Sequence, residues 1–416
     1  MRVAIVGGAR TPFVKAAGVF SAFSALDLGK HVVVSCVERL GLDPSQIDDL
    51  YFGTVLLDPR IPNLAREIVL RSGLPKTING HFVANNCITG LVAAQVASEA
   101  ISQGRVRCAL AGGSESMSQP TLTFPRQGEE FFISLAKARK VSEKLKLMKR
   151  FRPGFVLPQA PSPKEPSTGL TMGQHCELMA QEFRIGREAQ DELALRSHVQ
   201  AAVAKNEGVL REQIVPLGGV AEDNLVRGDT SLEKLRTLAP VFDRGPSGTI
   251  TAGNASALTD GASVVCLMSE ELARSSGMNI YGYLDGIEYA TVPPGDGLLM
   301  APAVALPRLL KRHKLQVGEI DLFEIHEAFA AQVLCNLSAW ERGWARYPDV
   351  QPLGDIPRDR INVFGGSIAL GHPFAATGGR VLMNLCQALE RKGMRRGIIS
   401  VCAAGGGAAA ALVSRD

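Results

Sequence analysis

The sequence predicts an α/β protein of stacked sheets and helices, built from two similar halves. Short apolar runs such as VAIVGG and CALAGG alternate with amphipathic helical stretches, which is typical of layers with buried strands. Two pairs of segments repeat: GLDPSQIDDLYFGTV (41–55) is similar to KLQVGEIDLFEIHEAF (314–329), and RVRCALAGGSES (105–116) to RRGIISVCAAGGG (395–407). Two such halves packed face to face would place their matching loops around one shared site.

Composition narrows the function classes. The 416 residues are 46% hydrophobic and 21% charged, as in ordinary globular proteins, and the net charge is +4. A mild positive charge suits an anionic small ligand, and no aromatic-plus-basic motif argues for nucleic acid. Eight cysteines without CxxC pairing indicate reduced core thiols and a cytoplasmic location. The N-terminus MRVAIVGGARTPF reads directly as a strand rather than a secretory signal, and no 18-residue apolar span occurs.

The middle of the chain differs in character from both halves. It holds a basic helix-like segment, a Pro-rich linker (VLPQAPSPKEPSTG) and a charged helix (FRIGREAQDELALRSHVQAAVAKNEGVL). Buried-strand composition returns with TITAGNASALTDGASVVCLM. We therefore expect a first half at 1–120 plus 249–278, an inserted region at 121–248, and a second half at 279–416.

The basic segment SLAKARKVSEKLKLMKRFR, at 134–152, has eight Lys or Arg residues and one Glu. Val141, Leu145 and Met148 would share one helical face. Two interpretations stay open: a solvated helix over the core, or a surface that binds a partner subunit, acidic lipid or the phosphates of an anionic ligand.

Cys87 stands in HFVANNCITG (81–90), where a strand leads into an Ala-rich helix that stops at Gly104. A thiol at a helix N-terminus feels the positive end of the helix dipole, which favours the thiolate. The ordinary alternative is a small buried hydrophobe. A reactive thiol would need a base, an acid and an anion trap from elsewhere in the chain.

Two glycine-rich segments of the second half offer such partners. FGGSIALGHPFAATGGR surrounds His372 with glycines and places it before a helix, as Cys87 is placed in the first half. Cysteine plus histidine is the minimal pair for an activated thiol nucleophile, although a histidine satisfied by a Gly-rich turn is equally consistent. SVCAAGGGAAA places Cys402 after a buried strand and before free main-chain N–H groups, so that it is either a second reactive thiol or core packing.

Two further segments carry polar residues. FEIHEAFAAQ (323–332) places His326 and Glu327 where a strand enters a helix. A zinc site is not expected there, because the zinc motif needs a second histidine four residues after the first, and position 330 is alanine. TAGNASALTDGAS is a small-residue loop with Asn254 and Ser256, suited to close approach by a narrow ligand.

Together these segments resemble the thiolase family from end to end. ARTPF, GGSESMS, TAGNAS, HEAFA, GGSIALGHPFAATGGR and CAAGGG occur in the family's order and spacing. The resemblance implies the thiolase fold: two similar βαβαβαββ halves that give a five-layered αβαβα core, with an inserted loop domain.

The resemblance also implies roles. Cys87 resembles the nucleophile that is acylated, His372 its base, and Cys402 the acid/base that acts on the acetyl-CoA methyl carbon. One oxyanion hole would be His372 with a water held by His326, and the other the N–H groups of Cys87 and Ala404. The pantetheine channel would be lined by Ser256, Met172 and Ala328.

The implied activity is that of a degradative 3-ketoacyl-CoA thiolase of fatty acid β-oxidation, with coenzyme A as substrate and no permanent cofactor. His326, where many thiolases have Asn, and Phe374 with Ala375 are similar to the β-subunits of fatty-acid-oxidation complexes. Thr171, where many short-chain enzymes have His, indicates a thioester pocket unlike that of a dedicated acetoacetyl-CoA enzyme. The resemblance further implies a homodimer, an α-subunit with hydratase and dehydrogenase activity as a possible partner, and a possible membrane contact through 134–152.

Three other functions remain as alternatives. One is a biosynthetic acetoacetyl-CoA thiolase. A second is a β-ketoacyl synthase-like condensing enzyme, whose Cys-His-His set could be mimicked by Cys87, His326 and His372, although a decarboxylating enzyme has no need of Cys402. The third is a non-catalytic acyl-CoA binding protein, which would be expected to lose at least one residue of the reactive set.

Overall fold

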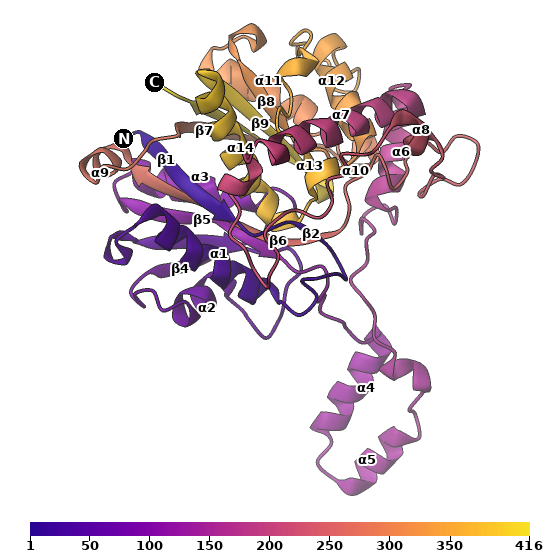
Figure 1. The fold of residues 1–416 in the computed structure, drawn as a ribbon. Helices are drawn as coiled ribbons and strands as arrows, with labels where there is room; N and C mark the ends of the chain where they lie inside the picture. The colour runs from indigo at the N-terminus through magenta and orange to yellow at the C-terminus, as the bar shows by residue number, and fades with distance from the viewer.

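The computed structural model describes residues 1–416 as two similar halves with a pair of helices projecting from the body (Figure 1). The strands are β1 (Val3–Arg10), β2 (Val14–Lys15), β3 (Asp49–Gly53), β4 (Asn79–Val83), β5 (Cys108–Glu115), β6 (Thr259–Ser269), β7 (Gly282–Thr291), β8 (Leu322–Ile325), β9 (Arg396–Ala403) and β10 (Gly407–Ser414). Hydrogen bonding joins them in the order β4-β3-β5-β6-β1-β7-β10-β9-β8, and β2 pairs with β6.

The strand order repeats between the halves. In the first half β3 runs parallel to β5, and β5, β6 and β1 are antiparallel neighbours. In the second half β8 runs parallel to β9, and β9, β10 and β7 are antiparallel neighbours. Both segment pairs that repeat in the sequence therefore occupy equivalent strands, β3 with β8 and β5 with β9. The strands of the two halves pair with each other only where Ala4 and Ile5 of β1 meet Tyr283 and Gly282 of β7.

One strand differs between the halves. The first half has the parallel edge strand β4 beside β3. At the equivalent place beside β8, the second half has a single parallel bridge between Phe323 and Ile361.

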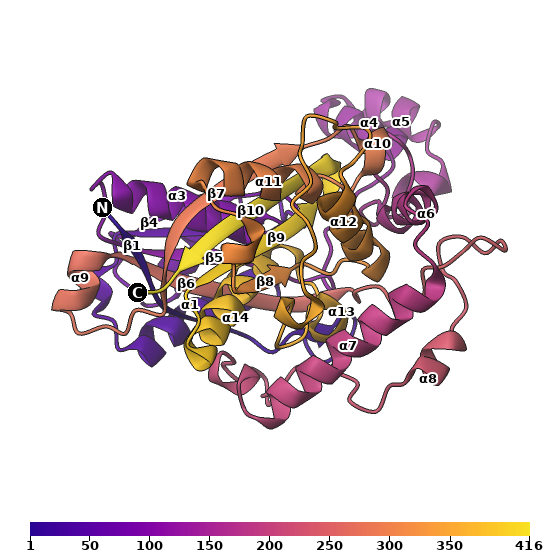
Figure 2. The ribbon, with the colours of Figure 1, turned by 90° about the horizontal axis from the view of Figure 1, so that it is seen from above.

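The chain has fourteen α-helices, six of which form three of the five layers (Figures 1 and 2). They are α1 (Ala25–Leu40), α2 (Leu64–Arg71), α3 (Thr89–Ser102), α4 (Arg126–Lys137), α5 (Val141–Met148), α6 (Met172–Glu182), α7 (Arg187–Asn206), α8 (Leu232–Arg236), α9 (Glu270–Ser275), α10 (Pro294–Gly297), α11 (Pro302–His313), α12 (Ala330–Arg342), α13 (Ser367–Leu370) and α14 (Thr377–Lys392). Helices α1 and α2 cover the outer face of the first sheet, and α11 and α12 that of the second. Helices α3 and α14 lie between the two sheets.

The buried core explains this layering. The central cluster of 37 buried residues joins α3 and α14 to the inner faces of both sheets. Helix α3 faces this cluster with Ala93, Ala94, Ala97 and Ala100, whose small side chains let the layers approach closely. The expected five-layered αβαβα arrangement is therefore confirmed.

The inserted region departs from one expectation. Its basic segment is two helices rather than one, because α4 ends at Lys137 and α5 begins at Val141. Helix α5 has no buried residue, and Val141, Leu145 and Met148 are 73%, 62% and 49% exposed. A solvated helix over the core is therefore wrong, since α4 and α5 extend away from the body on two connecting segments (Figure 1).

The projecting helices have a small aromatic cluster of their own. The Phe131 ring lies 5.3–5.6 Å from the rings of Phe132, Phe151 and Phe155, which holds α4 against the segment after α5. None of the helices combines the length and the apolar character that crossing a membrane requires.

Candidate active site

Cys87 lies in the turn between β4 and α3, as the sequence predicts. The preceding residue, Asn86, has a φ of 46°, a left-handed conformation that turns the chain sharply before the thiol. The Asn86 side chain donates to the main-chain oxygen of Ala404 at 3.0 Å and so ties this turn to the second half. Of the eight cysteines, seven are buried, and only Cys87 is partly exposed.

His372 lies in the equivalent turn of the second half, between α13 and α14. Its main-chain N–H donates to Thr259 Oγ1 at 3.1 Å, and its ring Nδ1 lies 2.6 Å from Thr377 Oγ1. The ring is buried, and its Nε2 has no protein partner. The fold therefore holds His372 at one nitrogen and leaves the other available.

Glycines let the two turns approach each other. A Cβ atom added at Gly90, in the first turn of α3, would lie 2.8 Å from the Ala375 oxygen and 3.1 Å from Gly378 Cα in α14. The first turns of α3 and α14 thus touch main chain to main chain. This contact brings the Cys87 and His372 turns to adjoining positions in the middle layer.

Glu115, at the end of β5, joins the same two regions. Its buried carboxylate accepts hydrogen bonds from Thr54 Oγ1 at 2.9 Å and from the main-chain N–H groups of Leu56 at 2.8 Å and Ala375 at 3.3 Å. Burial raises the pKa of Glu115, and these donors lower it. Its position at a shared boundary suits a structural acceptor.

Cys402 and Ala404 approach the Cys87 thiol from the end of β9. Burial raises the Cys87 pKa to about 12, and the N–H groups of Ala404 and Cys87 itself, directed at the sulfur, lower it. Burial also raises the pKa of Cys402 well above its ordinary value, and the neighbouring Cys87 raises it further. Two thiols and two main-chain donors therefore meet at one place.

His326 follows β8 and faces His372. The two ring centroids are 4.1 Å apart, with the planes tilted by 48°. Burial lowers the pKa of both rings, that of His372 to about 3, and the Arg380 charge lowers both further. Both imidazoles are therefore uncharged near neutral pH, and each has one nitrogen that donates and one that accepts a hydrogen bond.

This arrangement defines the chemistry available. The partly exposed Cys87 neighbours a second, buried thiol and two converging N–H groups, and two neutral imidazoles face each other at the adjoining turn. Such a set suits acyl transfer through a thioester, with a base for the thiol and donors for an oxygen anion.

The residues expected along the pantetheine channel come together in part. The Ser256 N–H donates to the Ala328 oxygen at 2.9 Å, and both residues are partly exposed. Met172, the first residue of α6, is also partly exposed. Asn254 is fully buried instead, and its Nδ2 donates to Asp191 Oδ1 at 2.9 Å, so its amide holds the loop together.

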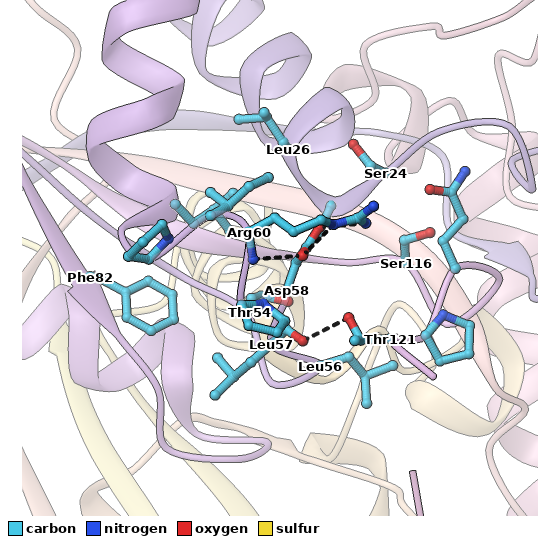
Figure 3. A pocket seen from close by; sticks show the side chains of 17 residues that line it. Ser24, Leu26, Thr54, Leu56, Leu57, Asp58, Arg60, Phe82, Ser116 and Thr121 are labelled. Atoms are coloured by element: carbon cyan, nitrogen blue, oxygen red, sulfur yellow. Dashed lines mark hydrogen bonds and ion pairs between the residues drawn. The ribbon is translucent and has the colours of Figure 1, made fainter. Parts of the chain in front are cut away.

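A cavity of about 300 Å³ adjoins the Glu115 network through Thr54 (Figure 3). Its lining includes Thr54, which binds Glu115, and the apolar residues Leu26, Leu56 and Phe82, but none of the reactive residues. Thr121 closes one side by donating to the Leu57 oxygen at 2.9 Å.

Sequence reasoning missed several supporting residues. Glu165, in the Pro-rich linker, is 8% exposed and accepts from the Gly405 N–H at 3.1 Å. Ser367 and Arg380 form a chain of hydrogen bonds to His326. The serine and the arginine lie within the glycine-rich motif around His372, so their proximity to that motif was the available signal. Nothing in the linker's composition distinguishes Glu165 from its exposed neighbours.

Family comparison agrees with the fold. The thiolase N-terminal domain model matches residues 3–271, and the thiolase C-terminal domain model matches residues 278–415. The chain belongs to the thiolase family.

Individual relatives match over nearly the whole chain. A 3-ketoacyl-CoA thiolase of Pectobacterium carotovorum subsp. carotovorum is 41% identical, over 97% of this chain and 94% of the relative. A 3-ketoacyl-CoA thiolase of Pseudoalteromonas translucida is 40% identical, over 99% of this chain and 97% of the relative.

Two solved structures have the same fold. The Bacillus anthracis acetyl-CoA acetyltransferase superimposes with a TM-score of 0.83 at 30% identity, over 99% of this chain and 98% of the other. The Acat5 thiolase of Ascaris suum, solved in complex with coenzyme A, gives a TM-score of 0.83 at 29% identity over 100% of both chains.

Proposed function

We propose that this thiolase is a degradative 3-ketoacyl-CoA thiolase, an acetyl-CoA C-acyltransferase of fatty acid β-oxidation. It would cleave a 3-ketoacyl-CoA with coenzyme A into acetyl-CoA and a shortened acyl-CoA. The observation that carries the proposal is that Cys402 neighbours Cys87, the one partly exposed cysteine, while the contact between α3 and α14 brings the turn of the neutral His372 next to the Cys87 turn. The relatives at about 40% identity that bear this name support it.

In the first half-reaction, Cys87 loses its proton to His372 and attacks the C3 carbonyl carbon. The oxygen anion of the resulting adduct needs donors, and His326 and His372 each have a buried Nε2 without a protein partner. Cleavage of the C2–C3 bond then leaves an acyl group on Cys87 and releases acetyl-CoA as its enolate. Cys402 supplies the proton that converts the enolate carbon to the methyl group. The proton that His372 took from Cys87 then passes to the Cys402 thiolate, so that His372 is neutral again before the second half-reaction.

In the second half-reaction, the thiol of a second coenzyme A loses its proton to His372 and attacks the acyl-cysteine. The tetrahedral adduct would be stabilised by the N–H groups of Cys87 and Ala404, which are directed at the sulfur of Cys87. Removing one donor of such a hole costs about 3–4 kcal/mol of transition-state stabilisation. Collapse releases the shortened acyl-CoA and regenerates the Cys87 thiolate.

Substrate contacts and domain organisation belong to the same proposal. Coenzyme A enters as a substrate, with Ser256, Met172 and Ala328 along its pantetheine arm and no permanently bound cofactor. The halves at 1–120 plus 249–278 and at 279–416 each supply one catalytic turn. The inserted region, 121–248, covers their junction.

The assembly is part of the proposal as well. We assign a homodimer and a cytoplasmic location. The eight unpaired thiols support the location, because a reducing compartment keeps thiols free. The projecting helices α4 and α5, with basic residues and exposed apolar side chains, would contact an α-subunit or a membrane surface. A biosynthetic acetoacetyl-CoA thiolase is the second candidate, favoured by the similarity to an acetyl-CoA acetyltransferase.

Thiolysis rates for 3-ketoacyl-CoA substrates of four to sixteen carbons test the proposal. Cleavage of medium or long chains is expected, and activity confined to the four-carbon substrate would favour the biosynthetic candidate. Peptide mapping after acid quench is expected to find the acyl group on Cys87 alone. Acyl label on Cys402 would reverse the assigned roles, and no thiolysis at any length would reject the activity.

A further inference from the structure

Behind His326 lies an arginine that is almost completely enclosed. Arg380, on α14, is 1% exposed, and its Nη2 donates to Ser367 Oγ at 2.6 Å. The same Ser367 oxygen lies 2.8 Å from Nδ1 of His326. The three side chains therefore form one chain of hydrogen bonds that ends on the imidazole.

The chemistry of the three side chains determines which group is the donor and which the acceptor in each of the two hydrogen bonds. A guanidinium can only donate, so Ser367 Oγ accepts from Arg380. The serine hydroxyl has one proton of its own, and no acceptor other than His326 Nδ1 lies within hydrogen-bonding distance of it. A buried hydroxyl proton without an acceptor costs about 1–3 kcal/mol. The Ser367 hydroxyl therefore donates to Nδ1, and Nδ1 of His326 carries no proton.

The other ring nitrogen must then carry the proton. The His326 ring is uncharged, since burial first, and then the neighbouring His372 ring and the charge of Arg380, disfavour its protonated form and lower its pKa. A neutral imidazole without a proton at Nδ1 has one at Nε2. That Nε2 is buried and has no protein partner, and its ring faces His372 at 4.1 Å. It is a donor presented to whatever occupies the site.

The Arg380 guanidinium makes no hydrogen bond other than the one to Ser367. Its Nε and Nη1 find no hydrogen-bond partner, although the buried carboxyls of Glu324 and Glu327 lie near enough to interact with its charge. Burial raises the pKa of Glu324 to about 8, with the Arg380 charge opposing that rise. The bond to Ser367 is thus the single hydrogen bond of the guanidinium.

We infer that Arg380 and Ser367 are positioning residues that hold His326 in its Nε2–H tautomer, so that it acts as a fixed hydrogen-bond donor to a reacting oxygen or its water. This inference rests on the proposed function for the identity of the oxygen. The tautomer itself follows from the hydrogen bonds and does not depend on the reaction.

Nitrogen NMR of protein labelled at histidine tests the tautomer without any assay of activity. The chain has seven histidines, and a His326→Asn variant identifies the signals of His326. In the parent protein we expect a pyridine-type signal at Nδ1 and a pyrrole-type signal at Nε2. In Ser367→Ala we expect a mixture of tautomers. A pyrrole-type Nδ1 in the parent protein would overturn the inference.

Ser400→Ala provides a matched control. Ser400 is a buried serine beside His326, because its main-chain oxygen accepts from the His326 N–H at 2.8 Å, but its hydroxyl has no partner. Its replacement removes a buried hydroxyl without touching the ring and should leave the His326 signals unchanged. The same tautomer shift in Ser367→Ala and Ser400→Ala would mean that any local change disturbs the ring.

Thiolysis kinetics give the functional measure. Ser367→Ala should lower kcat on the order of 100-fold with little change in KM, as for a lost or misdirected oxyanion donor. In a His326→Asn background, the same change should cost much less, because an amide has no tautomer to fix. An equal loss in both backgrounds would reduce Ser367 to a packing role. If the parent shows no thiolysis, the proposed function fails, while the NMR result still decides the tautomer.

Discussion

The carboxylate of Glu165 accepts a hydrogen bond of 3.1 Å from the main-chain N–H of Gly405. Glu165 comes from the inserted region, and Gly405 follows Ala404, whose own N–H is directed at the Cys87 sulfur. On the other side, Asn86 donates to the Ala404 oxygen at 3.0 Å. The loop that supplies the proposed anion donor is therefore held from both sides by parts of the chain remote in sequence.

Replacing Glu165 with Ala should release one side of this loop. A misplacement of about 1 Å at a catalytic group can cost ~100-fold in rate, so we expect kcat to fall by up to about that factor. The fold should persist, because the two sheets do not depend on this contact. Steady-state thiolysis and thermal unfolding measured together would separate the two effects.

Glu165→Gln is the matched control for that variant. Its amide oxygen can still accept from the Gly405 N–H, so most of the activity should return. If Gln and Ala variants lose the same activity, the negative charge of Glu165 would be what matters, and not the position of the loop.

Cys402→Ser should separate two partial reactions. The serine hydroxyl is a far weaker acid than a thiol, so exchange of the acetyl-CoA methyl protons with solvent should fall by about 100- to 10,000-fold or more. Acylation of Cys87 by a simple acyl-CoA needs no such proton transfer and should continue. Deuterium exchange and mass mapping measure the two steps, and equal losses in both would indicate that Cys402 only supports the fold.

Gly90→Ala should disturb the spacing of the two catalytic turns. The new Cβ would meet the Ala375 oxygen at 2.8 Å and Gly378 Cα at 3.1 Å, which are main-chain atoms that cannot rotate away. Overpacking of this kind typically costs about 1–3 kcal/mol, and we expect lower stability together with lower kcat. Gly318→Ala, at an exposed glycine with no atom within 4 Å of the added Cβ, should change neither.

The buried imidazole of His372 should make the protein sensitive to acid. Burial first, and then the Arg380 charge, lowers its pKa from 6.5 to about 3 in the folded state. Between these values the unfolded chain binds a proton that the folded chain does not, so this histidine lowers the free energy of unfolding as pH falls from about 6.5 towards 3. His372→Asn should make the slope shallower by at most about 1.4 kcal/mol per pH unit. Urea unfolding between pH 7 and 4 measures it, and an identical slope would contradict the neutral assignment.

The strand pattern and the internal repeat could be predicted from the sequence, because both depend on the local periodicity of apolar residues. β3 and β8 follow the same short turn, and β5 contains a glycine pair where β9 leads into a glycine run. The four candidate reactive side chains, those of Cys87, His326, His372 and Cys402, could be predicted because each stands in a short, distinctive motif. Periodicity does not reveal which apolar helix faces the rest of the fold will cover. For that reason the sequence left α5 open to two interpretations, a helix over the core or a binding surface.

The contacts that hold the Ala404 loop could not be predicted, because both join residues far apart in the chain. Glu165 and Gly405 are 240 positions apart, and Asn86 and Ala404 are 318 apart. An acidic residue in a Pro-rich linker resembles its solvated neighbours until the fold brings it to a partner. The His326 tautomer likewise depends on Arg380, whose burial is decided by the packing of α14 between two sheets.

The main-chain contact between α3 and α14 also bears on how such proteins can diverge. Because the distance from nucleophile to base is set by glycines and not by side-chain length, substitutions in the outer layers leave it unchanged. The surroundings of the site, including the appendage of α4 and α5 and the walls of the channel, are then free to vary from one lineage to another. Selection can therefore change which molecules reach Cys87 and His372 without changing the position of these two residues.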